Sequence, residues 1–353
     1  MKTLMAGIAA LVAVTACGSS SVARHSMSTP SPAAVGSPAT LASCRLPIGG
    51  FVPGAPKGQP DHSTSADGYP NQQGMGGFID LSTDKYTPVA TSDRAYVQGA
   101  WLPVLPSAVS PDRSSYAVTR GYNLYLGDAK SGTERLLHAW PAGVLGTVVA
   151  FTADGIYVMT LESGNQPQPG GAGPDTQLVL VRTDSGTVSQ VPGSARPAGA
   201  YAMIWSAVSA GAAWGALMTI SAGVATNALI RLDLATGETA KWWAGPGFPA
   251  VSGFDSNGHP LIPTSLAGPA QLEVITAPGQ VTTVAPQGGT FNPGRPSVVS
   301  DSHGAWFGSA DGAIWLYTTD GVFKKVGTVQ PNVGGSSQPY DLHSMRSVAG
   351  PCE

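Results

Sequence analysis

Short apolar segments alternate with polar turn sequences along most of this chain, and residues 297–327 show the pattern most clearly. The turns lie at 301–304, 309–312 and 319–321, and the segments between them contain AWFG, AIWLYT and VFKKVG. Aromatic and β-branched residues of this kind are typical of strands, and Asp320 followed by Gly321 is typical of a tight hairpin. The pattern therefore predicts four consecutive antiparallel strands. Because one such sheet cannot bury both of its faces, it needs further copies to pack against.

Two series of turns indicate that this four-strand unit is repeated. The third turn recurs upstream at intervals of about 40 to 55 residues, and copies of the first turn lie between its copies in constant order. The third-turn copies end at Gly132, Gly186, Gly237, Gly279 and Gly321, and the first-turn copies contain Asp112, Gly155, Gly211, Gly258 and Gly304. Repeats of this length with four strands each are the signature of β-propellers.

The repeat predicts a single all-β propeller over residues 44–353. Five units of four strands are expected at 101–142, 143–193, 200–245, 248–287 and 294–329. The flanking segments, 44–100 and 330–353, are expected to form one composite blade, because propellers commonly close the ring with both chain ends and so remove open sheet edges. This arrangement gives six blades. Seven blades are the alternative, because the two flanking segments are long enough for one more.

Several motifs of these units resemble those of known propellers. The D-x-x-G-x-W pattern at 301–306 and the G-x-I-W pattern at 312–315 are similar to blades of the extracytoplasmic quinoprotein and streptogramin-lyase-like propellers. The chain as a whole resembles a group of uncharacterised bacterial lipoproteins. That resemblance is carried by CRLP at 44–47, GFI at 77–79, WLPV at 101–104, SPD at 110–112 and AGPC at 349–352. It implies a propeller at an extracytoplasmic address, and it implies no activity.

The N-terminal residues resemble an export signal. Residues 1–16 contain Lys2 followed by an apolar run that is too short to cross a membrane and long enough for a signal peptide. VTAC at 14–17 resembles a lipobox, which implies cleavage before Cys17 and lipidation of its thiol. The alternative is an ordinary secretory signal with an incidental cysteine. Residues 17–43, rich in Ser, Ala and Pro, predict a flexible tether, so we expect a protein anchored at the outer face of the cytoplasmic membrane.

The composition limits the classes of partner. The hydrophobic fraction of 42% is sufficient for a large core, which argues against a disordered chain. The net charge of −3, with only 11% charged residues, indicates no basic surface for nucleic acid. We expect a monomer with no cofactor, which binds a protein or a cell-envelope ligand on one propeller face.

Apart from Cys17, the chain contains two cysteines, Cys44 and Cys352, at the two ends of the predicted propeller. An exported protein meets non-reducing conditions, in which pairing is the expected state. The composite blade would bring both chain ends to one sheet, within the separation that a disulfide requires. We therefore expect a Cys44–Cys352 disulfide, and the alternative is a pair of free thiols.

The sequence offers no catalytic or metal-binding motif. His259 and His303 lie beside first turns and could in principle serve as metal ligands or as a lyase base, but their positions in the repeat differ, so we interpret them as solvent-exposed turn residues. The aspartates of DAKSG, DLATG and TTDG could suggest calcium, but no copy has the dense acidic loop that calcium needs. We expect these aspartates to stabilise hairpins.

One connection is longer than a hairpin requires. Residues 162–177, rich in Pro and Gly, join the second and third strands of their unit, and we interpret them as a flap on the ligand face; the alternative is a tolerated insertion. The inter-blade loops on the same face provide the candidate ligand-binding residues, whose arginines could hold an anionic group. These residues are Arg196, Tyr201, Phe248, Asn292 and Arg295.

The sequence favours a binding or scaffold module over two alternatives, a small-site lyase or hydrolase at the channel mouth and a structural component of an envelope complex. An enzyme should bring titratable groups with perturbed pKa values together in one cavity. A binding module should instead expose a broad apolar or aromatic patch on one face. The distribution of exposed side chains over the two faces therefore separates these functions.

Overall fold

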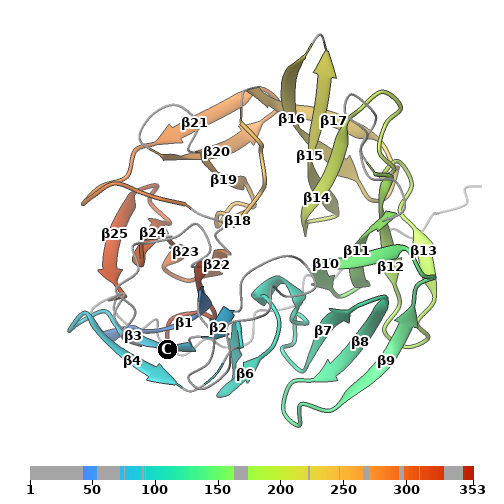
Figure 1. Cartoon of the computed structure of the whole chain (residues 1–353). Coiled ribbons are helices and arrows are strands. Elements are labelled where there is room, and N and C mark those ends of the chain that lie inside the picture. The colour runs from blue at the N-terminus through green and yellow to red at the C-terminus, as the bar shows by residue number, and fades with distance from the viewer. Residues whose placement is uncertain are drawn as a thin grey trace, which may run out of the picture. The chain divides into compact units, whose positions relative to one another are not determined.

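The computed structural model describes residues 43–53, 72–74, 76–89, 91, 93–162, 174–221, 223–245, 247–264, 270–293, 298–309, 311–329 and 345–353. These residues form a six-bladed β-propeller (Figure 1), which confirms the predicted fold class. The predicted signal peptide and most of the predicted tether lie outside the described residues. No helix in the described part of the chain is long and apolar enough to cross a membrane.

Four blades are complete antiparallel meanders whose strands follow chain order from the centre of the ring outwards (Figure 1). Blade 3 contains β10 (Val144–Thr152), β11 (Gly155–Glu162), β12 (Thr176–Val181) and β13 (Val188–Gln190). Blade 4 contains β14 (Ala202–Ser209), β15 (Ala212–Ser221), β16 (Val224–Asp233) and β17 (Thr239–Gly245). Blade 5 contains β18 (Gly253–Phe254), β19 (Pro260–Thr264), β20 (Gln271–Ala277) and β21 (Gln280–Val284). Blade 6 contains β22 (Val298–Asp301), β23 (Gly304–Gly308), β24 (Ala313–Thr318) and β25 (Phe323–Thr328).

Blade 1 is built from both ends of the chain. Its central strand β1 (Arg45–Pro53) pairs on one side with β3 (Gly76–Asp80), which in turn pairs with β4 (Lys85–Val89). On its other side β1 pairs with both β2 (Gln72–Gly74) and β26 (Met345–Val348), so that Val348 lies opposite Ile48. The composite blade is therefore confirmed, and the ring closes with six blades.

Blade 2 departs from the prediction of four strands over 101–142. Its sheet contains β7 (Ser115–Arg120), β8 (Asn123–Asp128) and β9 (Glu134–Ala139), and its first strand is reduced to one bridge between Val109 and Tyr116. Trp101 instead belongs to a separate hairpin of β5 (Ala95–Val97) and β6 (Ala100–Leu102). Pro103 and Pro106 explain the difference, because proline lacks the N–H that a strand ladder needs. Pro106 starts the short helix η2 (Pro106–Ala108).

Aromatic side chains fill the spaces between blades. Successive residues of a strand point to opposite faces of its sheet. The side chains of β23 and β24 therefore pack against both blades that adjoin blade 6, namely blades 1 and 5. Trp306 packs with Ile48 and Ile79 of blade 1, whereas Trp315 packs with Leu272 of blade 5 and Phe323, and both indoles are fully buried. Trp306 and Trp315 therefore belong to the core between blades.

The repeated aspartates stabilise hairpins. In the third turn of blade 2, Asp128 Oδ1 accepts the backbone N–H groups of Lys130 and Ser131 at 3.0 and 2.7 Å. In blade 4, Asp233 Oδ1 accepts those of two turn residues at 3.0 Å. These backbone hydrogen bonds lower the pKa of both carboxyl groups. Gly132 and Gly237 close the turns with φ of +69° and +75°, where a side chain would be strained.

Candidate functional site

The order of the strands defines two faces of the ring. Because neighbouring strands are antiparallel, all first and third turns lie on one face, and all second turns and inter-blade connections lie on the other. We call them the first-turn face and the second-turn face. The turn aspartates described above belong to the first-turn face.

Both ends of the propeller lie on the first-turn face. Arg45 lies opposite Asp80, next to the third turn of blade 1, and its neighbour Cys44 reaches bonding distance of Cys352, with a Cα–Cα separation of 5.4 Å. The pair stands where a first turn would join β26 to β1. The backbone N–H of Cys352 also donates to Asp301 Oδ2 of blade 6 at 3.0 Å. The predicted cysteine partners are therefore brought together in one blade.

Arg196, the best described of the predicted anion-binding residues, already has protein partners. Its guanidinium donates to Asp175 Oδ1 at 2.6 Å and to the carbonyl oxygen of Ala200 at 2.5 Å, and its side chain is only 11% exposed. These contacts join the start of β12 to the connection between blades 3 and 4. Arg196 therefore stabilises a loop, and its charge is paired with a carboxylate instead of being offered to a ligand.

The structure does not gather the other predicted residues into one cavity of the described part of the chain. Tyr201 is half-buried, and its N–H donates to the carbonyl oxygen of Met218 at 2.9 Å. Phe248 is exposed, and Asn292 is exposed with its backbone bonded to the Ser309 hydroxyl. Arg295 and residues 163–173 of the predicted flap lie outside the described residues.

Large exposed apolar side chains gather on the second-turn face. Nine large hydrophobic residues of the described chain are exposed, and seven of them lie at this face on blades 2 to 4 or on the loop that follows. These seven, which we call the apolar surface, are Leu105, Tyr122, Leu145, Ile204, Ile220, Val224 and Phe248. The elements that carry Leu105, Leu145 and Ile204 are neighbours, because β10 contacts both η2 and β14. Sequence reasoning found only Phe248 among them.

The hairpin of β15 and β16 extends the apolar surface beyond the sheet. Pairing with β14 stops at Met218 and pairing with β17 stops at Asn227, so residues 219–226 pair only with each other at the rim of the ring (Figure 1). Ile220 and Val224, near the tip, are 48% and 62% exposed. The tip carries no charged residue that would discourage association. These features are typical of a contact surface.

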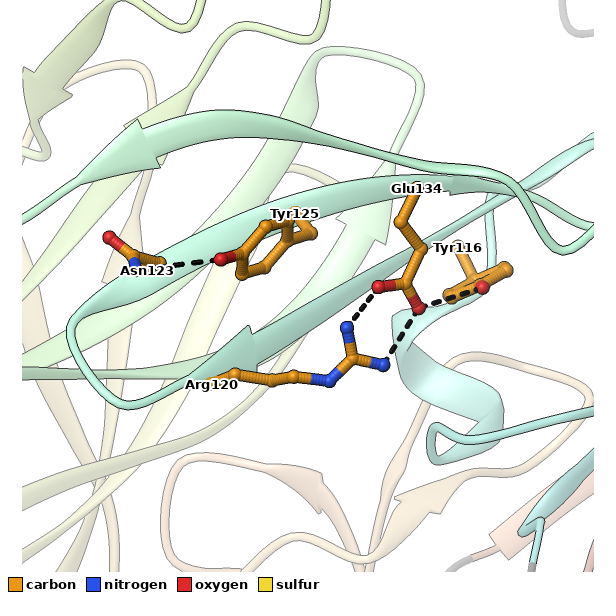
Figure 2. Close-up of polar contacts among 5 residues, drawn as sticks. All are labelled: Tyr116, Arg120, Asn123, Tyr125 and Glu134. Carbon is orange, nitrogen blue, oxygen red and sulfur yellow. Dashed lines mark hydrogen bonds and ion pairs between the residues drawn. The ribbon is translucent and has the colours of Figure 1, made fainter.

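A polar cluster in blade 2 is internally satisfied (Figure 2). Glu134 of β9 accepts hydrogen bonds from the Tyr116 hydroxyl at 2.9 Å and from two nitrogens of Arg120, both on β7. Gly127 lies between Tyr116 and Glu134 in the sheet, and a Cβ there would come within 2.2 Å of the tyrosine ring. Burial and the hydrogen bond to Glu134 raise the pKa of Tyr116 to about 12. The cluster therefore connects the strands of the blade, and its three side chains are bonded to one another.

The two turn histidines each bond an aspartate of their own turn. His259 Nδ1 lies 2.9 Å from Asp255 Oδ2, and His303 Nδ1 lies 3.1 Å from Asp301 Oδ1. His259 is 32% exposed, as a turn residue should be, but His303 is only 15% exposed and packs beside Trp306. The expectation of a solvent-exposed turn residue is therefore wrong for His303, because its ring folds back onto the inter-blade core.

A cleft of about 270 Å³ opens on the first-turn face between blades 5 and 6. It lies on the face opposite to the predicted ligand face. Its walls come from the first turn of blade 5 and from the start of β23, the end of β24 and the third turn of blade 6. The lining residues are Asp255, Ser256, Asn257, Gly304, Ala305, Tyr317, Thr318, Thr319, Asp320 and Gly321.

Comparison with known proteins assigns no family to this chain. No family model and no curated protein matches the sequence. Among solved structures, TolB from Acinetobacter baumannii is 13% identical over 80% of this chain and 67% of that chain, with a TM-score of 0.44. A putative TolB from Agrobacterium tumefaciens is 12% identical over 70% and 85%, with a TM-score of 0.45. Oligogalacturonate lyase from Vibrio parahaemolyticus is 11% identical over 74% and 83%, with a TM-score of 0.34.

Proposed function

We propose that this chain is a lipid-anchored extracytoplasmic propeller that binds a protein partner through the apolar surface. The observation that carries the proposal is the unequal distribution of exposed apolar side chains, which gather on the second-turn face. Concentrations of exposed apolar side chains commonly mark protein interaction sites. The polar clusters around Arg196 and Glu134 are internally paired, so they favour binding over the alternative of a small-site enzyme.

The position of the chain ends supports this arrangement. The chain enters the propeller at Cys44, on the first-turn face. A tether attached there would join the propeller on the face opposite the apolar surface. A partner could then bind the second-turn face without displacing the point of attachment. This geometry suits a receptor or scaffold for another envelope protein.

Lipidation of Cys17 is tested by labelling growing cells with a radioactive or alkyne fatty acid. We expect the wild-type protein to carry the label and the Cys17→Ser variant to carry none, because the thiol is the attachment point implied by the lipobox. The variant should retain the thermal midpoint of the wild-type propeller, since the substitution lies outside it. Equal labelling of the two proteins would remove the anchor from the proposal.

The binding face is tested by photo-crosslinking in intact cells. A photoreactive amino acid at Val224 should give a discrete adduct with a second protein, whereas the same amino acid at Val281 should give none. Val281 is 38% exposed on the outer strand β21 and is therefore a matched apolar control away from the apolar surface. The substitution Ile220→Ser should reduce the adduct at Val224. Equal adducts at both positions, or none at either, would contradict the assigned face.

A further inference from the structure

The cleft between blades 5 and 6 has walls that are held in place by the protein itself. In the first turn of blade 5, Asp255 Oδ1 accepts the backbone N–H groups of Asn257 and His259 at 2.8 Å. In the third turn of blade 6, the Thr318 hydroxyl and the backbone of Val322 exchange two hydrogen bonds of 3.0 Å. Gly304 is required where β23 pairs with β24 at the edge of the cleft, since a Cβ there would lie 2.0 Å from the carbonyl oxygen of Tyr317. A ligand would therefore meet a preformed site.

Several polar groups of the cleft remain available to a ligand. Within the described part of the chain, the side chains of Ser256, Asn257 and Thr319 and the Tyr317 hydroxyl form no hydrogen bond with protein. Burial and the charge of Asp255 raise the pKa of Tyr317, so its hydroxyl stays a donor at neutral pH. The Asp320 carboxylate is an acceptor. The cleft thus offers both donors and acceptors.

The lining excludes some classes of ligand. None of its ten residues is Lys, Arg or His, and two carboxylates are present, so the charge of the lining disfavours an anion. Asp255 is already engaged by its own turn and by His259. The attraction for a cation therefore rests on Asp320 alone, which is exposed to solvent. The volume lies just below the roughly 300 to 1,000 Å³ of pockets for drug-sized ligands, which indicates a smaller molecule.

We propose that this cleft binds one unit of a neutral polyhydroxylated ligand, such as a pyranose sugar. Adjacent hydroxyl groups of a sugar both donate and accept, which matches the mixture of amide, hydroxyl and carboxylate groups in the lining. The Tyr317 ring provides an apolar wall for the C–H face of the sugar. The site lies on the first-turn face, opposite the apolar surface, so the two sites can be occupied independently.

The test uses the full chain and a matched set of sugars at pH 7. Saturation-transfer NMR and titration would compare the neutral sugars glucose, galactose and N-acetylglucosamine with the anion glucuronate and the cation glucosamine. At least one neutral sugar should bind, and both charged sugars should bind more weakly. The double variant N257A/T319A should raise its dissociation constant about tenfold or more, because each lost hydrogen bond weakens binding several-fold.

Two controls separate a lost site from a damaged fold. The double variant should keep the wild-type thermal midpoint, because neither side chain has a protein partner, and Asn292→Ala on the second-turn face should bind sugar like the wild type. A Tyr317→Phe variant, which keeps the ring and loses the hydroxyl, should bind with intermediate affinity. Absence of binding by every neutral sugar, unchanged binding by the double variant, or preference for glucosamine or glucuronate would overturn the proposal.

Discussion

Replacement of Cys44 by serine is expected to lower the free energy of unfolding by about 3 to 5 kcal/mol, one of the two largest effects predicted for this chain. The two cysteines are separated by 308 residues in sequence, and their Cα atoms lie 5.4 Å apart. A bond across so long a loop removes much entropy from the unfolded chain, for which the chain-entropy treatment gives about 5 kcal/mol. The bond also joins the two ends of the chain that together form blade 1.

The disulfide prediction is measured by denaturant unfolding under non-reducing conditions, together with peptide mapping of the purified mature protein. Cys352→Ser should lose as much stability as Cys44→Ser, and the double variant should lose no more than either, because all three remove the same bond. Reductant should destabilise the wild type and leave the variants unchanged. Two freely alkylated thiols in the unreduced wild type would rule out the bond.

Replacement of Trp315 by alanine is expected to cost about 3 to 5 kcal/mol of stability. The indole is fully buried between blades 5 and 6, with its ring centre 5.5 Å from that of Phe291 and 5.2 Å from that of Phe323. Alanine would leave a cavity surrounded by rigid aromatic rings that cannot collapse into it. Thermal and denaturant unfolding would measure the loss.

A second substitution at the same position separates packing from hydrogen bonding. The indole N–H of Trp315 is buried and has no partner in the described part of the chain. Trp315→Phe removes this unsatisfied donor while it keeps an aromatic ring, so we expect a smaller cost of about 1 to 2 kcal/mol. Equal destabilisation by phenylalanine and alanine would mean that the N–H, and not the volume of the ring, provides the stability. That outcome would contradict the packing explanation.

The sequence predicted the blades and their closure because the signals for them are local. Gly132 and Gly237 mark turns that need a left-handed backbone, and Asp128 and Asp233 accept backbone hydrogen bonds in the same turns. Strand order follows directly from such a series of hairpins. The two flanking segments were expected to share one further blade, with a seventh blade as the alternative, and β26 pairs with β1 as the six-blade prediction requires.

The prediction of four strands in blade 2 was wrong for a reason that is also local. WLPV at 101–104 contains residues typical of strands, but Pro103 and Pro106 prevent continuous pairing beside β7. The strand signal of Trp101 was real, since it lies in β6. The sequence pattern did not show which strand it would join.

The surfaces were harder to predict because they depend on positions that are distant in sequence. Ile204 and Ile220 resemble core residues by type, but Ile204 alternates with the buried Met203 and Trp205 along β14, and Ile220 lies near the end of β15. Asn257 and Thr319 form one cleft although 62 residues separate them, because blades 5 and 6 bring the first turn of one to the third turn of the other. The pairing of Arg196 with Asp175 likewise joins the start of β12 to the connection between blades 3 and 4, which two strands separate in the chain.

The closure of blade 1 also determines how the propeller would respond to mechanical tension. A pull on the segment that precedes Cys44 reaches the fold at the first residue of β1, where an unbonded strand could be peeled from β26 one pair at a time. A covalent link to Cys352 transfers the same load to the opposite end of the chain, and the contact with Asp301 carries part of it into blade 6. If the proposed tether and partner pull on the propeller, the force would thus pass through two strands and two blades together.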